Sequence, residues 1–196
     1  STRQNRLHRP RGGKNVVRKS EKLNKKIDKM VFPGLQGGPH MNNIAAKAVC
    51  FGEALTPAFK KYAKQILKNA KAMEKVFKKH KIRMIGGGTS NHLILADVFG
   101  SLGVTGKEAQ TLLDEVGITL NMNMIADDPR KPMDPSGIRF GTPAITTRGF
   151  KEKECALVAE LMIETLKNKD NKKKKEEIRK KIKTLARKFP IPKNFV

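Results

Sequence analysis

The sequence contains only two cysteines, Cys50 and Cys155, among 196 residues. They have no CxxC spacing and lie on apolar faces of predicted helices, so the sequence gives no indication of a disulfide framework or a zinc site. Their pattern is typical of small buried hydrophobic residues in a reducing compartment. We therefore expect a cytoplasmic protein with no bound metal.

Long apolar runs are also missing. No stretch of about 18 apolar residues occurs, which excludes a membrane-spanning helix. We find no secretory signal pattern either. The sequence therefore predicts a protein without a membrane partner.

Tryptophan is absent and tyrosine occurs once, whereas the 42 basic residues outnumber the 18 acidic residues and give a net charge of +24. Most of the basic residues are lysines spread along the chain. Nucleic-acid sites usually combine arginine forks with stacked aromatic rings. We interpret most of the charge as solvated surface. A basic nucleic-acid-binding fragment is the alternative that the composition disfavours.

The chain is long enough for a hydrophobic core, with 38% apolar residues. A Gly/Pro loop from Pro33 to Pro39 opens into a helical pattern that begins near Met41. We expect Pro39 in the first helical turn, with Gly37 and Gly38 beside the helix start, an arrangement that can bind phosphate. The alternative is an ordinary tight turn before a core helix.

Apolar spacing predicts a long helix that restarts at Thr56–Pro57 and continues to about Lys79. After it the pattern predicts strands and helices in the order strand, strand, helix, strand, strand, helix, helix. The predicted strands are residues 82–85, 93–98, 118–120 and 137–140, with a polar loop over 121–135. This order indicates an α+β layer, a sheet with helices on one face.

Three positions in this second part suit ligand binding. Arg139 lies in a strand between glycines and suits a small carboxylate, although a structural ion pair is the alternative. Asn121 and Asn123 offer paired amides to a planar ligand, or else they begin an Asx-rich loop. His92 is interpreted as a structural histidine rather than a catalytic one. Asp127 and Asp128 are interpreted as loop surface.

Five segments together resemble the serine hydroxymethyltransferase family, the fold-type I pyridoxal-phosphate enzymes also called glycine hydroxymethyltransferases. They occur in family order: VFPGLQGGPH (31–40), KNAKA (68–72), GGTSNHL (87–93), LGVTGKEA (102–109) and SGIRFGTPAITTRGF (136–150). The resemblance implies conversion of serine and tetrahydrofolate to glycine and methylenetetrahydrofolate. It also implies a dimer and the small carboxy-terminal α+β domain, with a mixed or antiparallel sheet, after a long linking helix. Residues 1–59 would be a remnant of the large cofactor-binding domain and residues 60–196 the small domain.

The resemblance also implies roles for individual residues. Arg139 matches the arginine that binds the substrate carboxylate, and Asn123 matches the amide that contacts the folate pteridine. Gly37 and Gly38 match glycines that reach the cofactor phosphate of the partner subunit, and Arg11 matches an arginine near the cofactor.

Two departures from the family pattern affect the expected activity. The resemblance covers only the second half of the family, without the groups that stack on and protonate the pyridine ring. Asn5 also occupies the position of the lysine that forms the Schiff base, and an amide cannot form that bond. We expect this chain alone to be catalytically inactive. It would pair with an amino-half polypeptide or a full-length homologue, or act as a non-catalytic partner of an intact homologue.

Overall fold

The computed structural model describes residues 21–192 and divides the chain between Lys60 and Lys61 into two compact units. Asn5 and Arg11 lie outside the described residues. The first unit contains α1 (Glu21–Lys29), an irregular helical turn η1 (Met30–Leu35) and α2 (Met41–Leu55). The helix α3 (Pro57–Lys79) begins in this unit and continues through the second one. No helix in the described part of the chain is long and apolar enough to cross a membrane.

The start of α2 differs from the prediction. His40 is the N-cap, with an extended backbone, so Pro39 precedes the helix instead of occupying its first turn. The backbone carbonyl of His40 accepts the first helical hydrogen bonds, from the N–H groups of Asn43 and Ile44. The predicted restart at Thr56–Pro57 is confirmed, since Pro57 begins α3 and the Thr56 hydroxyl accepts from the Phe59 N–H at 3.2 Å.

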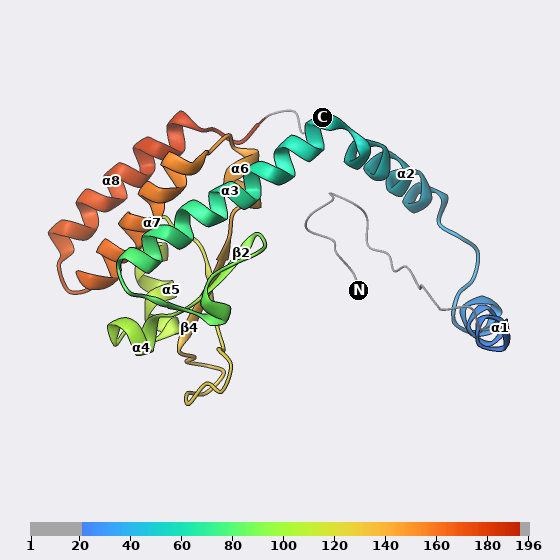
Figure 1. Cartoon of the computed structure of the whole chain (residues 1–196), viewed down its shortest axis with the longest axis horizontal. Coiled ribbons are helices and arrows are strands. Elements are labelled where there is room, and N and C mark those ends of the chain that lie inside the picture. Colours follow the sequence, from blue (N-terminus) through green and yellow to red (C-terminus); the bar gives the residue numbers. More distant parts are fainter. Residues whose placement is uncertain (1–20, 193–196) are drawn as a thin grey trace. The chain divides into compact units, whose positions relative to one another are not determined.

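The second unit is built around a four-stranded antiparallel sheet with the spatial order β1-β2-β4-β3 (Figure 1). The strands are β1 (Arg83–Met84), β2 (Leu93–Asp97), β3 (Asn121–Asn123) and β4 (Gly137–Gly141). This confirms the predicted α+β class, with an antiparallel rather than a mixed sheet. The longer helices are α5 (Gly106–Glu115), α7 (Glu152–Lys167) and α8 (Lys172–Lys188), and the short ones are η2 (Ile85–Gly87), α4 (Val98–Leu102) and α6 (Pro143–Thr147).

One face of the sheet forms the hydrophobic core. Ile94, Ala96 and Ile138 are fully buried there and belong to the same cluster as apolar side chains of α3, α5 and α7. Helix α8 packs farther out, where Ile178 and Ile182 form a second cluster with Leu161 of α7. Because side chains alternate along a strand, their neighbours Leu93, Leu95 and Arg139 lie on the opposite face. That face is the one available to a ligand.

The predicted strand at 118–120 is wrong, because the pairing begins at Asn121. Gly117 has a φ of 87° and follows the end of α5, and the N–H of Ile118 donates to the Leu113 carbonyl at 2.8 Å. Leu120 fills the core in an irregular segment. The apolar character of this segment therefore reflects the end of a helix, and the polar Asn121–Asn123 forms the edge strand.

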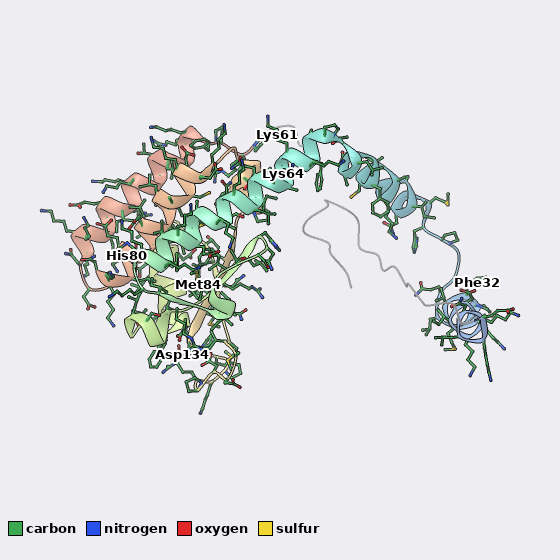
Figure 2. All side chains as sticks on the ribbon, viewed as in Figure 1. Phe32, Lys61, Lys64, His80, Met84 and Asp134 are labelled. Atoms are coloured by element: carbon green, nitrogen blue, oxygen red, sulfur yellow. The ribbon has the colours of Figure 1, made fainter. Side chains whose placement is uncertain are left out.

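The exposed faces of the helices carry most of the basic side chains. Lys61 and Lys64 are examples on α3 (Figure 2). This agrees with the interpretation of the charge as solvated surface.

Candidate functional site

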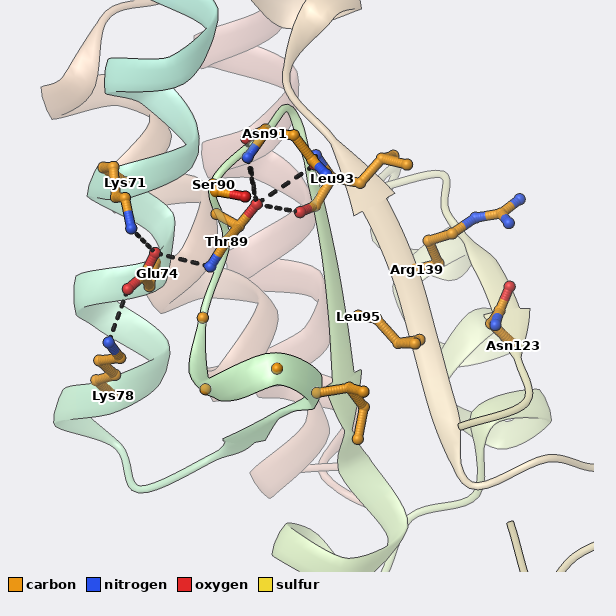
Figure 3. A pocket seen from close by; sticks show the side chains of 14 residues that line it. Lys71, Glu74, Lys78, Thr89, Ser90, Asn91, Leu93, Leu95, Asn123 and Arg139 are labelled. Carbon is orange, nitrogen blue, oxygen red and sulfur yellow. Dashed lines mark hydrogen bonds and ion pairs between the residues drawn. The ribbon is translucent and has the colours of Figure 1, made fainter. Parts of the chain in front are cut away.

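A cavity of about 690 Å³ opens on the face of the sheet that the core helices leave uncovered. Its wall combines α3, the turn that follows β1, and strands β2, β3 and β4 (Figure 3). The residues that line it are Lys71, Glu74, Lys78, Ile85, Gly86, Gly87, Gly88, Thr89, Ser90, Asn91, Leu93, Leu95, Asn123 and Arg139. The cavity is therefore large enough for a ligand bigger than a single carboxylate.

Arg139 extends into this cavity from the middle of β4. In the ladder it stands opposite Leu95 of β2 on one side and Asn121 of β3 on the other. Its side chain is exposed, and no hydrogen bond or ion pair joins its guanidinium to any residue within 21–192. A structural ion pair for Arg139 is thus not found in the described part. A free guanidinium beside an apolar leucine is suited to binding a carboxylate bidentately.

Asn123 lines the same cavity, two residue pairs along the ladder from Arg139 (Figure 3). Its side-chain amide donates to the Met124 carbonyl at 2.6 Å. The structure thus places Asn121 and Asn123 in an edge strand, and the predicted loop over 121–135 begins only after them. Asn123 and Arg139 are the two candidate ligand-binding residues that the fold brings to one cavity.

The opposite wall of the cavity contains an ion-pair cluster centred on Glu74. One carboxylate oxygen of Glu74 accepts from Lys78 Nζ at 2.7 Å, and the other accepts from Lys71 Nζ at 2.7 Å and from the Thr89 N–H at 3.0 Å. Glu74 is only 5% exposed. Burial alone would raise the pKa of Glu74, but the hydrogen bonds from Lys71, Lys78 and Thr89 outweigh it and lower the pKa to about 2. Glu74 is therefore ionised at any physiological pH.

The Glu74 cluster also fixes the turn that leads into β2. The Thr89 hydroxyl donates to the Leu93 carbonyl at 2.6 Å, and the Asn91 side chain accepts from the Leu93 N–H at 2.7 Å. Gly88 has a φ of 151°, and a Cβ at this position would meet the Glu74 carboxylate. The glycine is required at this point because the acidic side chain lies directly against the backbone.

Sequence reasoning missed Glu74, Lys71 and Lys78 as site residues. The evidence was present in α3, where a single acidic residue occupies an inward position of the apolar stripe with lysines three residues before and four residues after it. Such spacing places all three side chains on one part of the helix surface. What the spacing could not reveal is the loop that packs onto them.

Buried Asn69 joins α3 to the segment that follows β4. Its side-chain amide donates to the Thr146 hydroxyl at 2.8 Å and to the Phe150 carbonyl at 2.9 Å. The Thr142 hydroxyl, at the end of β4, donates to the Ile66 carbonyl of α3 at 2.9 Å. These bonds link two of the segments on which the family resemblance was based, and they anchor the strand that contains Arg139.

The other residues singled out in the sequence lie elsewhere. His92 is half-buried and is not among the lining residues of the cavity; its backbone carbonyl accepts from the Thr142 N–H. Gly37 and Gly38 are exposed in the first unit, and a Cβ at either position would meet no atom of residues 21–192 within 4 Å beyond its own chain neighbours. Their predicted contact with a cofactor phosphate stays a prediction.

The interpretation of both Asp127 and Asp128 as surface is wrong for Asp128. Asp127 is exposed, but the half-buried carboxylate of Asp128 accepts from the hydroxyl and the N–H of Ser136 and from two further backbone N–H groups. Burial would raise the pKa of Asp128, and these hydrogen bonds lower it to about 2. Asp128 thus organises the loop before β4.

Both cysteines are buried and unbonded to each other. Burial, followed by the nearby charges of Glu154 and Glu152, raises the pKa of the Cys155 thiol to about 12. Such a thiol is a packing residue rather than a nucleophile.

The described lining residues of the cavity do not fit pyridoxal phosphate as a whole. Both lysines are ion-paired with Glu74, and Glu74 is itself engaged, so the lining offers no free amine for an aldimine and no free carboxylate for a pyridine nitrogen. No aromatic ring lines the described cavity to stack on the cofactor. These residues fit a carboxylate and its neighbouring groups instead.

Comparison with known proteins shows the family of this chain. The family model described as serine hydroxymethyltransferase matches residues 4–162. The chain is 53% identical over 185 residues to a serine hydroxymethyltransferase of Francisella tularensis subsp. novicida (strain U112), and 52% identical to that of F. tularensis subsp. tularensis (strain SCHU S4). Each match covers 94% of this chain and 44% of the relative, in its carboxy-terminal part. The chain therefore spans less than half the length of these relatives.

Proposed function

Because the chain belongs to the serine hydroxymethyltransferase family, we propose that it is the carboxy-terminal part of an enzyme that converts serine and tetrahydrofolate to glycine and methylenetetrahydrofolate with pyridoxal phosphate. In this proposal residues 1–59 derive from the large cofactor-binding domain and residues 60–196 form the small domain. The cytoplasm is the proposed location, in keeping with two buried, unoxidised cysteines.

The observation that supports the proposal best is the free guanidinium of Arg139 on the open face of the sheet. In this role Arg139 binds the α-carboxylate of serine or glycine, and Leu95 keeps water from one side of the ion pair. Asn123, on the neighbouring strand, contacts the pteridine of the folate. The hydrogen bonds of Asn69 and Thr142 hold β4, and therefore Arg139, in place.

The proposal assigns the chain no transferase activity of its own. Pyridoxal phosphate, when bound by an enzyme of this kind, acts as the electron sink for the reacting carbon. Asn5 has no amine with which to bind it covalently, and the described cavity residues provide no substitute. The residues of this chain would bind and orient the substrate carboxylate, and other polypeptide would supply the rest.

Glycine binding tests the role of Arg139. Equilibrium dialysis of labelled glycine should show binding by the native chain that falls by about tenfold or more in Arg139→Gln, since one charge-assisted bidentate contact is lost. Lys75→Gln is the matched control, because Lys75 is an exposed lysine of α3 outside the cavity. Equal binding by all three proteins would refute the carboxylate role.

Absorbance tests the role of Asn5. A mixture of the chain and pyridoxal phosphate should show no internal-aldimine band stronger than that of pyridoxal phosphate mixed with free lysine. The Asn5→Lys variant, mixed with an amino-half polypeptide, should restore the band. A band in the native chain that disappears on borohydride reduction and maps to one lysine would contradict the proposal.

A second candidate, pairing with another polypeptide as a non-catalytic partner, is favoured by the surface of the first unit. Large apolar side chains are exposed there, including Phe32 at 63%, Leu35 at 79% and Leu55 at 78%. Phe32 is labelled in Figure 2. Exposed apolar side chains at this density are typical of a surface that another chain covers. Sedimentation of the chain alone, and of its mixture with a full-length homologue, would distinguish a homodimer, a mixed dimer and a monomer. A chain that stays monomeric in both samples would exclude this candidate.

A further inference from the structure

The cavity beside Arg139 contains three cationic side chains among its described lining, and they are not equivalent. Lys71 and Lys78 both hold Glu74, each at 2.7 Å, whereas Arg139 has no acidic partner within the described residues. Figure 3 shows the two lysines converging on Glu74 from α3, while Arg139 and Asn123 extend from the sheet on the other side. Glu74 therefore pairs with two of the three cations, and the cluster that they form retains one net positive charge, whereas Arg139 has no acidic partner among the described lining residues.

Glu74 holds both lysines, whose side chains are 55% and 54% exposed. Glu74 is 5% exposed, and each of its oxygens has a lysine partner, with the Thr89 N–H as a third donor. A ligand anion that approached Lys71 or Lys78 would also be repelled by the charge of Glu74, which lies 2.7 Å from each lysine nitrogen. An anion at Arg139 meets no such opposing charge from the described lining residues.

We propose that Glu74 is a specificity-determining residue: by holding Lys71 and Lys78, it weakens their attraction for a second ligand anion, so the cavity binds ligands with two carboxylates no more tightly than ligands with one. The inference rests on the proposed function, in which Arg139 binds a carboxylate. It concerns the second carboxylate of a ligand, because an isolated guanidinium binds one carboxylate of a mono- or dicarboxylate alike.

Removal of the Glu74 charge should convert the selectivity. In Glu74→Gln the side chain keeps its length, and its amide oxygen can still accept from the Thr89 N–H, but Lys71 and Lys78 lose their ionic partner. The second carboxylate of a dicarboxylate then gains a charge-assisted contact with either lysine. Acetate, with one carboxylate at Arg139, gains much less.

The experiment measures dissociation constants for acetate and for succinate, glutarate and adipate, which differ in the distance between their carboxylates. Backbone amide shifts of Gly86–Gly88 report binding at the cavity. We expect the native chain to bind acetate and each dicarboxylate within about threefold of one another, and Glu74→Gln to bind at least one dicarboxylate about tenfold more tightly. Arg139→Gln should weaken acetate binding in both backgrounds.

Three further variants isolate the cause, each judged by the ratio of the dissociation constants of acetate and the dicarboxylate. Glu160→Gln makes the same change of charge on α7, where Glu160 pairs with Lys79 and His80 outside the cavity, and it should leave the ratio unchanged. The triple variant Glu74→Gln/Lys71→Met/Lys78→Met removes the lysines together with the carboxylate. Because no lysine is left to bind a second carboxylate, its ratio of acetate to dicarboxylate affinity should equal that of the native chain. The double variant Glu74→Gln/Lys71→Met retains Lys78. It should therefore bind a dicarboxylate more tightly than the triple variant does, even if the single Glu74→Gln variant folds poorly.

The outcomes separate this inference from the proposed function. Acetate binding that is insensitive to Arg139→Gln would overturn both. A second outcome would overturn the role of Glu74 alone. In it, acetate binding depends on Arg139, but the affinity for a dicarboxylate relative to acetate is unchanged in every variant that contains Glu74→Gln. An equal gain in Glu160→Gln would also overturn it, because the effect would then reflect net charge rather than the cavity.

Discussion

Replacement of Asn69 by alanine should destabilise the second unit more than any single polar change on its surface. Asn69 is fully buried, and its amide donates to the Thr146 hydroxyl and the Phe150 carbonyl, while its oxygen accepts from Gln65 Nε2 at 2.9 Å. The substitution removes these bonds and leaves the Phe150 carbonyl, in a buried residue, without this donor. A buried polar group left unpaired costs about 1–3 kcal/mol.

With the small cavity included, we expect the free energy of unfolding to fall by about 3 kcal/mol. For a urea m-value of about 2 kcal/mol/M, the midpoint should then shift down by about 1.5 M. Tyr62 is the only tyrosine in a chain without tryptophan, and its hydroxyl lies 2.8 Å from that of Thr147, so its fluorescence reports unfolding of this same region.

The matched control is Thr111→Ala, which removes a side-chain hydrogen bond to the Lys107 carbonyl on the exposed face of α5. It should change the free energy of unfolding by no more than about 0.5 kcal/mol. A loss of less than about 1 kcal/mol in Asn69→Ala, or an equal loss in Thr111→Ala, would show that the Asn69 bonds do not hold α3 to the segment after β4.

The remaining predictions concern single residues of the second unit. Asp128→Asn should lower the free energy of unfolding at pH 7, and the difference from the native chain should shrink as the pH falls from about 4 toward 2. The reason is that a carboxylate with a folded pKa lowered to about 2 stabilises the fold only while it is ionised. A difference that persists at pH 2 in urea titrations would refute this. In a Cys50→Ser background, Cys155 should react with Ellman's reagent at least about 100-fold more slowly in the folded chain than in urea, because burial is the main cause that raises the pKa of its thiol to about 12. Comparable rates would show that the thiol is accessible. Gly106→Ala should lower the stability by about 2 kcal/mol or more, because the new Cβ would collide with the backbone carbonyl of Gly137; unchanged thermal unfolding would contradict the packing of α5 on β4.

The parts of the fold that the sequence predicted well have strong periodicity or unambiguous caps. Helix α3 begins at Pro57 and ends at Lys79 as expected, and the Thr56 hydroxyl caps it by accepting from the Phe59 N–H. The strands around Ile94 and Ile138 were predicted because an apolar stretch bounded by turns is typical of a covered sheet. In these segments local preference and tertiary packing agree.

The parts that the sequence could not provide depend on contacts between distant segments. Leu120 looks like a strand residue but fills the core after a helix end, and the polar Asn121 pairs instead because β4 offers it a free edge. The five-residue helices α4 and α6 are too short to show a helical period. Glu74 becomes a site residue only when Thr89 packs onto it, fifteen positions later in the chain.

The candidate site was therefore half predicted. Family motifs led to Arg139 and Asn123, and the fold brings both to one cavity. Neither periodicity nor motif indicated that Lys71 and Lys78 would line the same cavity and would both be paired with Glu74. That information lies in side-chain geometry, which depends on the packing of the loop at Gly86–Gly88 against α3.

The most direct test of this account is the resonance of the Arg139 Nε–H during a titration of the chain with glycine. We predict a saturable downfield shift, as a carboxylate accepts hydrogen bonds from the guanidinium, with no comparable shift for Arg83, whose guanidinium already pairs with Asp97. An Arg139 resonance that stays fixed to saturating glycine, or that moves in parallel with that of Arg83, would contradict the claim that this chain retains the carboxylate-binding part of its family's site.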